Sequence, residues 1–356
     1  MNVGFDFDKY LLYCENNNKK ARGFFSGGFL PVNTWTLGKN TFAVNSRDAE
    51  LMLSEQLAGI SETMEEYNDW IPYLEPWHGV GVFAEAFGCP FEWNDYDAPW
   101  TRTVVKDIEG LKRLKKPELK NSKMLQYVLR TTEYFNEQTR GQVYISATDT
   151  QSPVDNLTLI ADPTWFLTEA WDYPREFHRV LSNITDLMIE FTLEQRALCA
   201  KPAAPGHTTW SPDIFGGVSV SEDVMVMMGP DFYNEFAKPY NERFAEATGG
   251  IAIHSCGKWA HSFKAAQDTR GIVMADLSVS KIYDPDPNIP EKIISGFGDG
   301  KVPVQVRADY ADIKLIDELL GSDAKLILVL WRADSQADRE RQYNDIKERW
   351  AKKRKK

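Results

Sequence analysis

Short apolar segments alternate with longer amphipathic segments from about residue 141 to the end of the chain. The clearest apolar segment is 325–331. The longest amphipathic segment is 174–199, where Phe177, Val180, Ile184 and Phe191 fall on one side of a helix. Such an alternation is typical of a parallel sheet covered by helices.

Two apolar segments nearer the start bring the number of predicted strands to about eight, which favours a closed barrel. The predicted strands are 28–35, 70–74, 143–147, 207–217, 251–253, 271–276, 291–297 and 325–331. No glycine-rich phosphate-binding fingerprint follows the first of them, so a dinucleotide-binding sheet is not favoured. The sequence therefore predicts an α/β fold, a single (β/α)8 TIM barrel with extra N-terminal helices.

The length of 356 residues suffices for one barrel domain, with a helical extension over 1–27 and a basic tail over 351–356. A formal net charge of −11 and the absence of a basic stripe argue against nucleic-acid binding. No apolar run is long enough to span a bilayer, and no signal peptide is visible. The four cysteines are too scattered for a disulfide framework, so we expect a cytoplasmic protein.

A histidine and a cysteine follow the predicted strand at 251–253. His254 and Cys256 are two residues apart, so on an extended chain both side chains point to the same side. Imidazole and thiolate are good ligands for zinc. For an isolated His-x-Cys pair, a packed histidine beside a buried cysteine would be the favoured interpretation. The end of a strand is where α/β barrels keep their chemistry, and this supports a metal site.

A catalytic zinc ion usually takes three protein ligands and keeps one position open. Carboxylates expected at the same rim of the barrel are Glu222 and Asp223 after the fourth predicted strand, Asp276 at the end of the sixth and Asp299 after the seventh. We predict Glu222 as the third ligand and Asp223 as a catalytic residue. Helix capping or loop hydrogen bonding is the alternative for each acid.

Further candidates lie in predicted loops at this rim. Asp149 could orient a substrate or accept a proton, or it could form an Asx-type turn. Arg332 could clamp an anionic group or pair with a nearby acid, and Arg307 is a weaker candidate of that kind. His207 is a weaker candidate for a ligand or an acid/base. The predicted cofactor-binding residues, for which core packing is the alternative, are Trp77, His78, Trp210 and Trp331.

Three passages carry a resemblance to a known family: Ala-Glu-Ala-Phe-Gly-Cys at 84–89, Gly-Pro-Asp-Phe-Tyr-Asn-Glu-Phe-Ala-Lys-Pro-Tyr at 229–240, and Ile-His-Ser-Cys-Gly at 253–257. With them the chain resembles the uroporphyrinogen decarboxylase superfamily, which includes porphyrinogen decarboxylases and zinc-dependent corrinoid methyltransferases. The resemblance covers most of the chain. It implies a single (β/α)8 barrel with additional N-terminal helices.

The chain departs from both branches of that superfamily. Porphyrinogen decarboxylases carry an Arg-Gln-Ala-Gly-Arg loop after the first strand, whereas residues 33–38 here read Asn-Thr-Trp-Thr-Leu-Gly. The methyltransferases add a second cysteine near the last strand, whereas no cysteine follows Cys256 here. His254 and Cys256 match the zinc pair of the methyltransferases, and the third ligand of that family is missing.

The resemblance implies an enzyme that moves a methyl group between a corrinoid, presented by a carrier protein, and a small-molecule acceptor. Zinc would bind an acceptor thiol and lower its pKa, so that the thiolate can attack a methyl carbon. A decarboxylase that acts on a porphyrinogen or another carboxylated substrate is the first alternative, and the missing arginine loop argues against it. A non-catalytic barrel that binds a small molecule is the second alternative.

Overall fold

The computed structural model of the chain describes residues 4–35, 44–94, 97–331 and 333–355. Its strands are β1 (Val32–Trp35), β2 (Phe91–Glu92), β3 (Trp100–Thr101), β4 (Ile145–Ser146), β5 (Thr150–Gln151), β6 (Pro202–Ala203), β7 (Val218–Ser221), β8 (Ile251–His254), β9 (Ile272–Ser278), β10 (Val304–Asp309) and β11 (Leu326–Trp331). Its helices are α1 (Phe7–Ala21), α2 (Ala49–Thr63), α3 (Val82–Ala86), α4 (Ile108–Arg113), α5 (Lys123–Gln138), α6 (Pro153–Ile160), α7 (Pro163–Glu169), α8 (Pro174–Ala197), α9 (Pro230–Phe232), α10 (Lys238–Thr248), α11 (Phe263–Gln267), α12 (Pro290–Phe297), α13 (Ile313–Leu320) and α14 (Gln336–Arg354).

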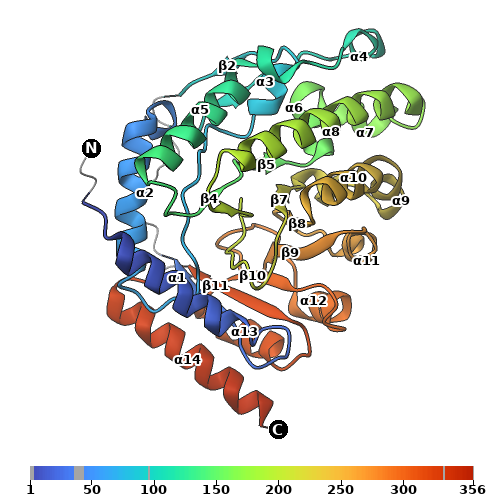
Figure 1. Cartoon of the computed structure of the whole chain (residues 1–356). Helices are drawn as coiled ribbons and strands as arrows, with labels where there is room; N and C mark the ends of the chain where they lie inside the picture. The colour runs from blue at the N-terminus through green and yellow to red at the C-terminus, as the bar shows by residue number, and fades with distance from the viewer. Residues whose placement is uncertain (1–3, 36–43, 95–96, 332, 356) are drawn as a thin grey trace.

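Parallel strands form the wall of the predicted barrel (Figure 1). Within the described residues, one sheet has the order β1-β11-β10-β9-β8-β7-β5, and β4 pairs in parallel with β6. Leu74 bridges to Ile145 of β4, and the backbone N–H of Asp69 donates to the carbonyl of Val32 in β1 at 3.2 Å. The segment 69–74 therefore joins β4 to β1, which confirms the barrel expected from the alternation of strands and helices.

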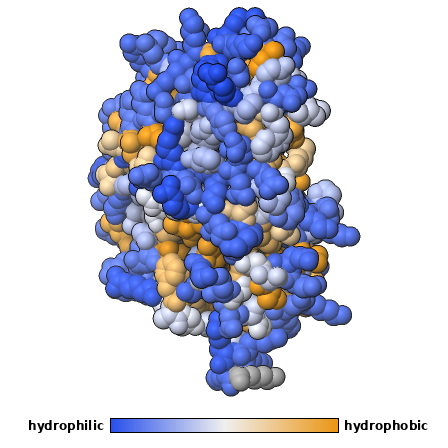
Figure 2. Space-filling model, turned by 90° about the vertical axis from the view of Figure 1, so that its right-hand side faces the viewer, coloured by the Kyte–Doolittle hydropathy of each residue, from blue (hydrophilic) through white to orange (hydrophobic). Residues whose placement is uncertain are grey.

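The helices pack around this wall with their apolar faces inward. Helix α8 illustrates why they form: Pro174 occupies its first turn, and Phe177, Ile184 and Phe191 share one fully buried stripe. In Figure 1 the helices α6 to α12 follow one another along one side of the barrel, while α1, α2 and α14 cover the other side. The surface in Figure 2 is largely hydrophilic, with small separate hydrophobic areas. No helix among the described residues is long and apolar enough to cross a membrane.

The seventh predicted strand, 291–297, is wrong: these residues form most of helix α12. Pro290 starts this helix, and Ile293 and Phe297 lie one turn apart on its buried face. The strand is instead β10, where buried Val304 and Val306 alternate with Gln305 and Arg307. Polar residues on the other face of β10 interrupt the apolar run that the sequence would need to signal a barrel strand.

The fourth predicted strand, 207–217, is also corrected. β6 ends at Ala203 and β7 begins at Val218, and the residues between them leave the wall as an inserted segment, 204–217. This segment runs inside the barrel, since the backbone N–H of Thr209 donates to the Gln305 side chain of β10 at 2.8 Å. In Figure 1 it is the yellow-green stretch between β4 and β10.

A glycine returns the inserted segment to the wall. Gly217 has a φ of 92°, a conformation that side chains disfavour. A Cβ at this position would lie 2.1 Å from the backbone oxygen of Gly250, just before β8. The close approach of two backbones thus requires glycine at the point where β7 begins.

Candidate metal centre

Three side chains of different chemistry meet at the carboxyl ends of β7 and β8. One ligand atom from each of Asp223, His254 and Cys256 lies within 4.8 Å of the others. His254 Nε2 is 3.3 Å from the Cys256 sulfur and 3.7 Å from Asp223 Oδ1. The His254 side chain is buried, whereas Asp223 and Cys256 are exposed. We call these three residues the triad; its two outer members face solvent.

The buried side of His254 is held by a carboxylate and a guanidinium. Nδ1 of His254 lies 2.6 Å from Oδ2 of Asp276 at β9, and Arg307 from β10 pairs with the same oxygen. Burial and the positive charge of Arg307 lower the pKa of His254 below its usual value. Burial acts to raise the pKa of Asp276, but Arg307 and His254 outweigh it and hold that pKa low. His254 is therefore kept neutral, which is the form that binds a metal ion.

Asp223 is oriented through backbone contacts. Its Oδ1 accepts the backbone N–H of Cys256 at 2.8 Å, which ties the loop after β7 to the turn after β8. Its own backbone N–H donates to Oδ2 of Asp155 at 2.6 Å, and that of Val224 donates to Oδ1 at 3.2 Å. Asp155, at the start of α6, thus fixes the turn that carries Asp223. This role could not be predicted from sequence, because an acidic residue in the first turn of a helix is common and Asp155 occupies such a position.

Glu222, the predicted third ligand, lies on the other side of the chain from the triad. Its side chain is fully buried and accepts hydrogen bonds from Ser152 Oγ at 2.9 Å and Asn241 Nδ2 at 2.5 Å. Burial raises the pKa of Glu222 to about 7. Neighbouring residues on an extended chain point in opposite directions, so Asp223 lies beside His254 and Cys256 while Glu222 points toward helices α6 and α10. The structure thus brings Asp223, not Glu222, to the histidine and cysteine.

The other acids considered as ligands have different positions. Asp276 supports Nδ1 of His254 from behind. Asp299 is exposed and pairs with Lys301 ahead of β10, at the opposite end of the barrel. Asp299 was predicted at the carboxyl end of a strand because residues 291–297 were predicted as the seventh strand; it in fact precedes β10.

A second polar group, Asp149 with His207, lies against the triad. The His207 ring stacks on that of His254, with centroids 4.4 Å apart and an interplanar angle of 25°. His207 Nε2 is 3.4 Å from Asp149 Oδ2, and Trp77 Nε1 reaches the same oxygen at 3.5 Å. Burial opposes both shifts, yet the pair raises the pKa of His207 and lowers that of Asp149. Asp149 and Trp77, both predicted as site residues, therefore lie beside the triad.

Glu75 belongs to the same region. It follows the strand segment that ends at Leu74, and its backbone is fixed by reciprocal 2.7 Å hydrogen bonds with the side chain of Gln56. Burial and the nearby Asp149 raise the pKa of Glu75 to about 8. An acid that retains its proton thus lies near an ionised one.

The remaining predicted residues lie elsewhere or outside the described residues. His78 is buried between Ser46 and Thr131, at 2.6 and 2.9 Å, and its pKa falls to about 4 because of burial. Trp210 is buried in the inserted segment and donates to the carbonyl of Phe215. Trp331 ends β11 and packs edge-on against Tyr283. Arg332 lies outside the described residues.

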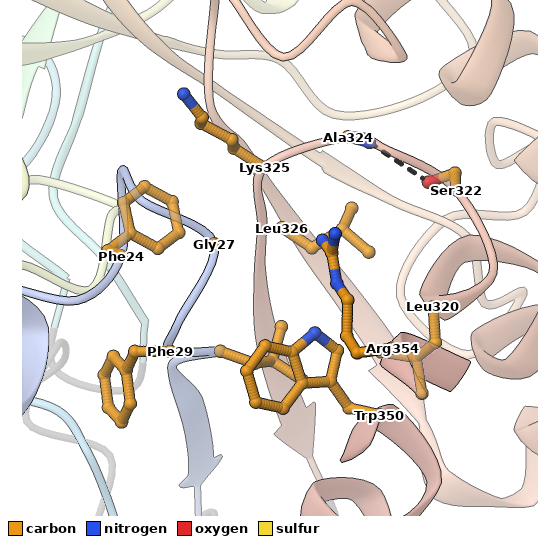
Figure 3. A pocket seen from close by; sticks show the side chains of 11 residues that line it. Phe24, Gly27, Phe29, Leu320, Ser322, Ala324, Lys325, Leu326, Trp350 and Arg354 are labelled. Carbon is orange, nitrogen blue, oxygen red and sulfur yellow. Dashed lines mark hydrogen bonds between the residues drawn. The ribbon is translucent and has the colours of Figure 1, made fainter. Parts of the chain in front are cut away.

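A small pocket, shown in Figure 3, lies at the other end of the barrel. Its lining includes Phe24, Phe29 and Trp350, together with Lys325 just before β11. None of the predicted site residues lines it. In α/β barrels this amino-terminal end serves stability rather than chemistry.

The donor set of the triad fits a zinc ion. Nitrogen, sulfur and carboxylate oxygen are all zinc ligands, and three protein ligands leave a position for a substrate. The Asp276–His254 contact is the carboxylate–histidine support common at such centres. Without a cation, the partial burial of the Cys256 sulfur beside His254 and the Asp223 carboxylate raise the pKa of the thiol to about 12, although the residue as a whole is exposed. A divalent cation would reverse that effect by its own charge.

Comparisons with known proteins agree with this architecture. The family described as uroporphyrinogen decarboxylase (URO-D) matches residues 78–210. This part of the chain resembles that family. Among solved structures, a methyltransferase from Methanosarcina mazei is similar with a TM-score of 0.63 and 15% sequence identity, over 93% of this chain and 98% of that one. No curated protein sequence gives a significant match.

These matches bear on different parts of the chain. The family match ends before β7, so it includes Asp149 and His207 but none of the triad. The structural match spans nearly the whole chain and, at its low identity, establishes the shared fold. The chemistry must therefore be argued from the residues themselves.

Proposed function

We propose that the protein is a methyltransferase that passes a methyl group between a corrinoid on a carrier protein and a small acceptor thiol. Zinc would be held by Asp223, His254 and Cys256. The observation that carries this proposal is the convergence of three different ligand types at the open rim of the barrel. The methyltransferase fold of the structural neighbour is consistent with it.

The three residues of the triad and the supporting Asp276 each have a task in this reaction. Oδ2 of Asp276 accepts a hydrogen bond from Nδ1–H of His254, so that the Nε2 lone pair would be free to bind the metal. Cys256 supplies sulfur, and Asp223 supplies a carboxylate that its contact with the Cys256 backbone already orients. A bound zinc ion would lower the pKa of an acceptor thiol so that it reacts as a thiolate near neutral pH.

His207 and Asp149 would handle the proton that the acceptor thiol releases. His207 stacks on His254, so it lies next to the place where the thiol must bind. Asp149 makes its imidazole a stronger base than a free histidine. The proton passes from sulfur to the imidazole, and the positive charge that results is balanced by the Asp149 carboxylate.

Decarboxylation of a porphyrinogen is less well supported. Several substrate carboxylates need cationic partners. Among the described residues next to the triad, Arg307 carries a guanidinium, and it is engaged by Asp276 and by the carbonyl of His207. That leaves little positive charge for a substrate with several carboxylates.

Metal analysis of the purified protein tests the proposal. Zinc is expected at about one ion per chain, and His254→Ala and Cys256→Ala should each remove it. Cys199→Ala is the matched control, because Cys199 follows α8 and its sulfur bonds to the carbonyl of Gln195. The metal centre would be refuted if His254→Ala and Cys256→Ala kept as much zinc as Cys199→Ala and the wild type.

Two titrations separate the alternative functions. Binding of a free corrinoid, followed by its visible absorption, is expected for a methyltransferase; no binding would favour the non-catalytic barrel. Binding of a porphyrin would favour the decarboxylase.

A further inference from the structure

A chain of buried side chains connects the triad to the inserted segment 204–217. It starts at Asp276, whose Oδ1 accepts a hydrogen bond from Gln305 Nε2 at 2.7 Å. Gln305 Oε1 accepts from the backbone N–H of Thr209 at 2.8 Å and from its hydroxyl at 2.5 Å. Thr209 Oγ1 in turn accepts from Asn33 Nδ2 at 2.7 Å. All four side chains are buried.

The hydrogen bond that joins Gln305 to Asp276 has only one possible direction, and it sets the orientation of the Gln305 amide. The Gln305 amide must donate to the Asp276 carboxylate, because a carboxylate only accepts. Its oxygen must then face Thr209, where a backbone N–H and a hydroxyl both donate. The Thr209 hydroxyl can donate to Gln305 because it accepts from Asn33. A flipped Gln305 amide would turn its nitrogen toward the two Thr209 donors and its oxygen toward the Asp276 carboxylate, so this amide cannot flip without leaving buried polar atoms unpaired.

Asp276, at one end of this row of hydrogen bonds, decides which ring nitrogen of His254 carries the proton. Arg307 Nη2 lies 2.7 Å from His254 Nδ1 and also pairs with Asp276 Oδ2. If Asp276 moved away, Arg307 would donate to Nδ1, and the imidazole proton would sit on Nε2. That tautomer has no lone pair facing Cys256 and Asp223. Gln305 counters this by holding the free oxygen of Asp276 from the opposite side.

We propose that Gln305 and Thr209 are positioning residues of the metal centre, which fix the Nδ1–H tautomer of His254 through Asp276. The inserted segment then supports the site and does more than pack the interior of the barrel. This inference rests on the proposed function for its consequence, which is tight metal binding. Its first claim, the tautomer, concerns the metal-free protein.

Both claims can be measured on the full-length protein. Long-range ¹H–¹⁵N spectra of ¹⁵N-histidine-labelled protein distinguish the two neutral tautomers, and His254→Ala assigns the signal among five histidines. Zinc affinity is measured by competition with a chromophoric chelator. Gln305→Leu is expected to shift His254 toward the Nε2–H form and to weaken zinc binding about ten- to a hundred-fold.

The matched control is Gln195→Leu. Gln195 is as buried as Gln305 and also joins a backbone N–H, from Thr148, to a threonine hydroxyl, of Thr132, but it contacts no triad residue. It should lose stability without a change in tautomer or zinc affinity. At position 209, Thr209→Val should act in the same direction as Gln305→Leu, and Thr209→Ser should restore wild-type values.

The outcomes distinguish this inference from the proposed function. An unchanged His254 tautomer in both Gln305→Leu and Thr209→Val would overturn it, whether or not the protein binds zinc. So would equal effects of Gln305→Leu and Gln195→Leu on zinc affinity. If Gln305→Leu fails to fold, the Thr209→Val and Thr209→Ser pair decides. A wild-type protein that shows the Nδ1–H tautomer yet binds no zinc would refute the proposed function and leave the positioning role intact.

Discussion

Replacing Glu222 by glutamine tests the reasoning about both stability and metal binding. The side chain is fully buried, and its oxygens accept from Ser152 and Asn241. Glutamine has the same shape and carries no charge. Its Nε2 would face Asn241, whose Oδ1 is buried and has no hydrogen-bond partner among the described residues. A flip of the Asn241 amide would therefore satisfy the new donor.

The expected change in stability follows from the pKa of Glu222. Burial raises it from 4.5 to about 7 in the folded protein. Below pH 4.5 both the folded and the unfolded chain keep the proton, so Glu222 contributes no difference. Between pH 4.5 and about pH 7 the unfolded chain loses the proton and the folded chain keeps it, so stability falls as pH rises. Above pH 7 the full cost of about 3 kcal/mol is present.

Other titratable groups surround Glu222 and change the free-energy difference expected for the variant. Asp155 has its own pKa raised by burial and by Glu222, and Asp223 and Tyr233 lie nearby. Removing the Glu222 charge lowers the cost of ionising Asp155, which adds to the gain of the variant at high pH. The advantage of Glu222→Gln over the wild type should therefore grow with pH, by up to about 3 kcal/mol between pH 5 and pH 8.

Urea unfolding of both proteins at pH 5 and pH 8, with a chelator present, measures this difference without a contribution from bound metal. Equal pH dependence of the two unfolding free energies would refute the assignment of a raised pKa to Glu222. The same variant should bind zinc within two-fold of the wild type. A loss of zinc binding as large as that of His254→Ala would mean that Glu222 is the third ligand after all, as the sequence alone suggested.

Three further results are expected. Asp223→Asn should weaken zinc binding at least about ten-fold in a chelator competition, because an amide is a poorer zinc ligand than a carboxylate; an unchanged affinity would remove Asp223 from the triad. Gly217→Ala should lower the unfolding free energy by at least about 2 kcal/mol, whereas Gly216→Ala, with open space around it, should have little effect; similar values would contradict the close backbone approach. Glu75→Gln should flatten the pH dependence of stability between pH 5 and pH 8, because the raised pKa of Glu75 makes the folded wild type lose stability as pH rises in that range; parallel pH profiles would argue against it.

The barrel could be predicted from sequence because most of its strands are apolar. Ile251–His254 and Leu326–Trp331 are almost entirely buried and appear in the sequence as short apolar runs. Pro174 and the periodic stripe behind it likewise identify α8. These features depend on local composition, and local composition is what a single sequence reports.

β10 was missed for the opposite reason. Two of its central residues, Gln305 and Arg307, are polar, and both contact Asp276 behind His254. A strand that contributes to a site in this way looks less like a barrel strand, and the error moved Asp299 to the wrong end of the barrel. The polar residues that β10 contributes near His254 are therefore the reason that the strand was not predicted.

The third ligand could not be chosen from sequence because Glu222 and Asp223 are adjacent. Both follow the same strand, and both carry a carboxylate. Which one points toward His254 depends on the pleat of β7 and on hydrogen bonds from Ser152 and Asn241, far away in the chain. The His-x-Cys pair was easier, since a spacing of two already places both side chains on one side.

The inserted segment changes how this barrel can be compared with its relatives. In a closed barrel of eight strands, side chains normally fill the interior in layers. Here part of that volume holds backbone, with Thr209 bonded to Gln305 and His207 stacked on His254. Polar backbone inside a barrel is stable only if its hydrogen bonds are satisfied, and Gln305 does so while it supports Asp276. The same residue thus meets a folding requirement, by pairing with the backbone of Thr209, and holds Asp276 behind His254, which is a requirement of the proposed metal site.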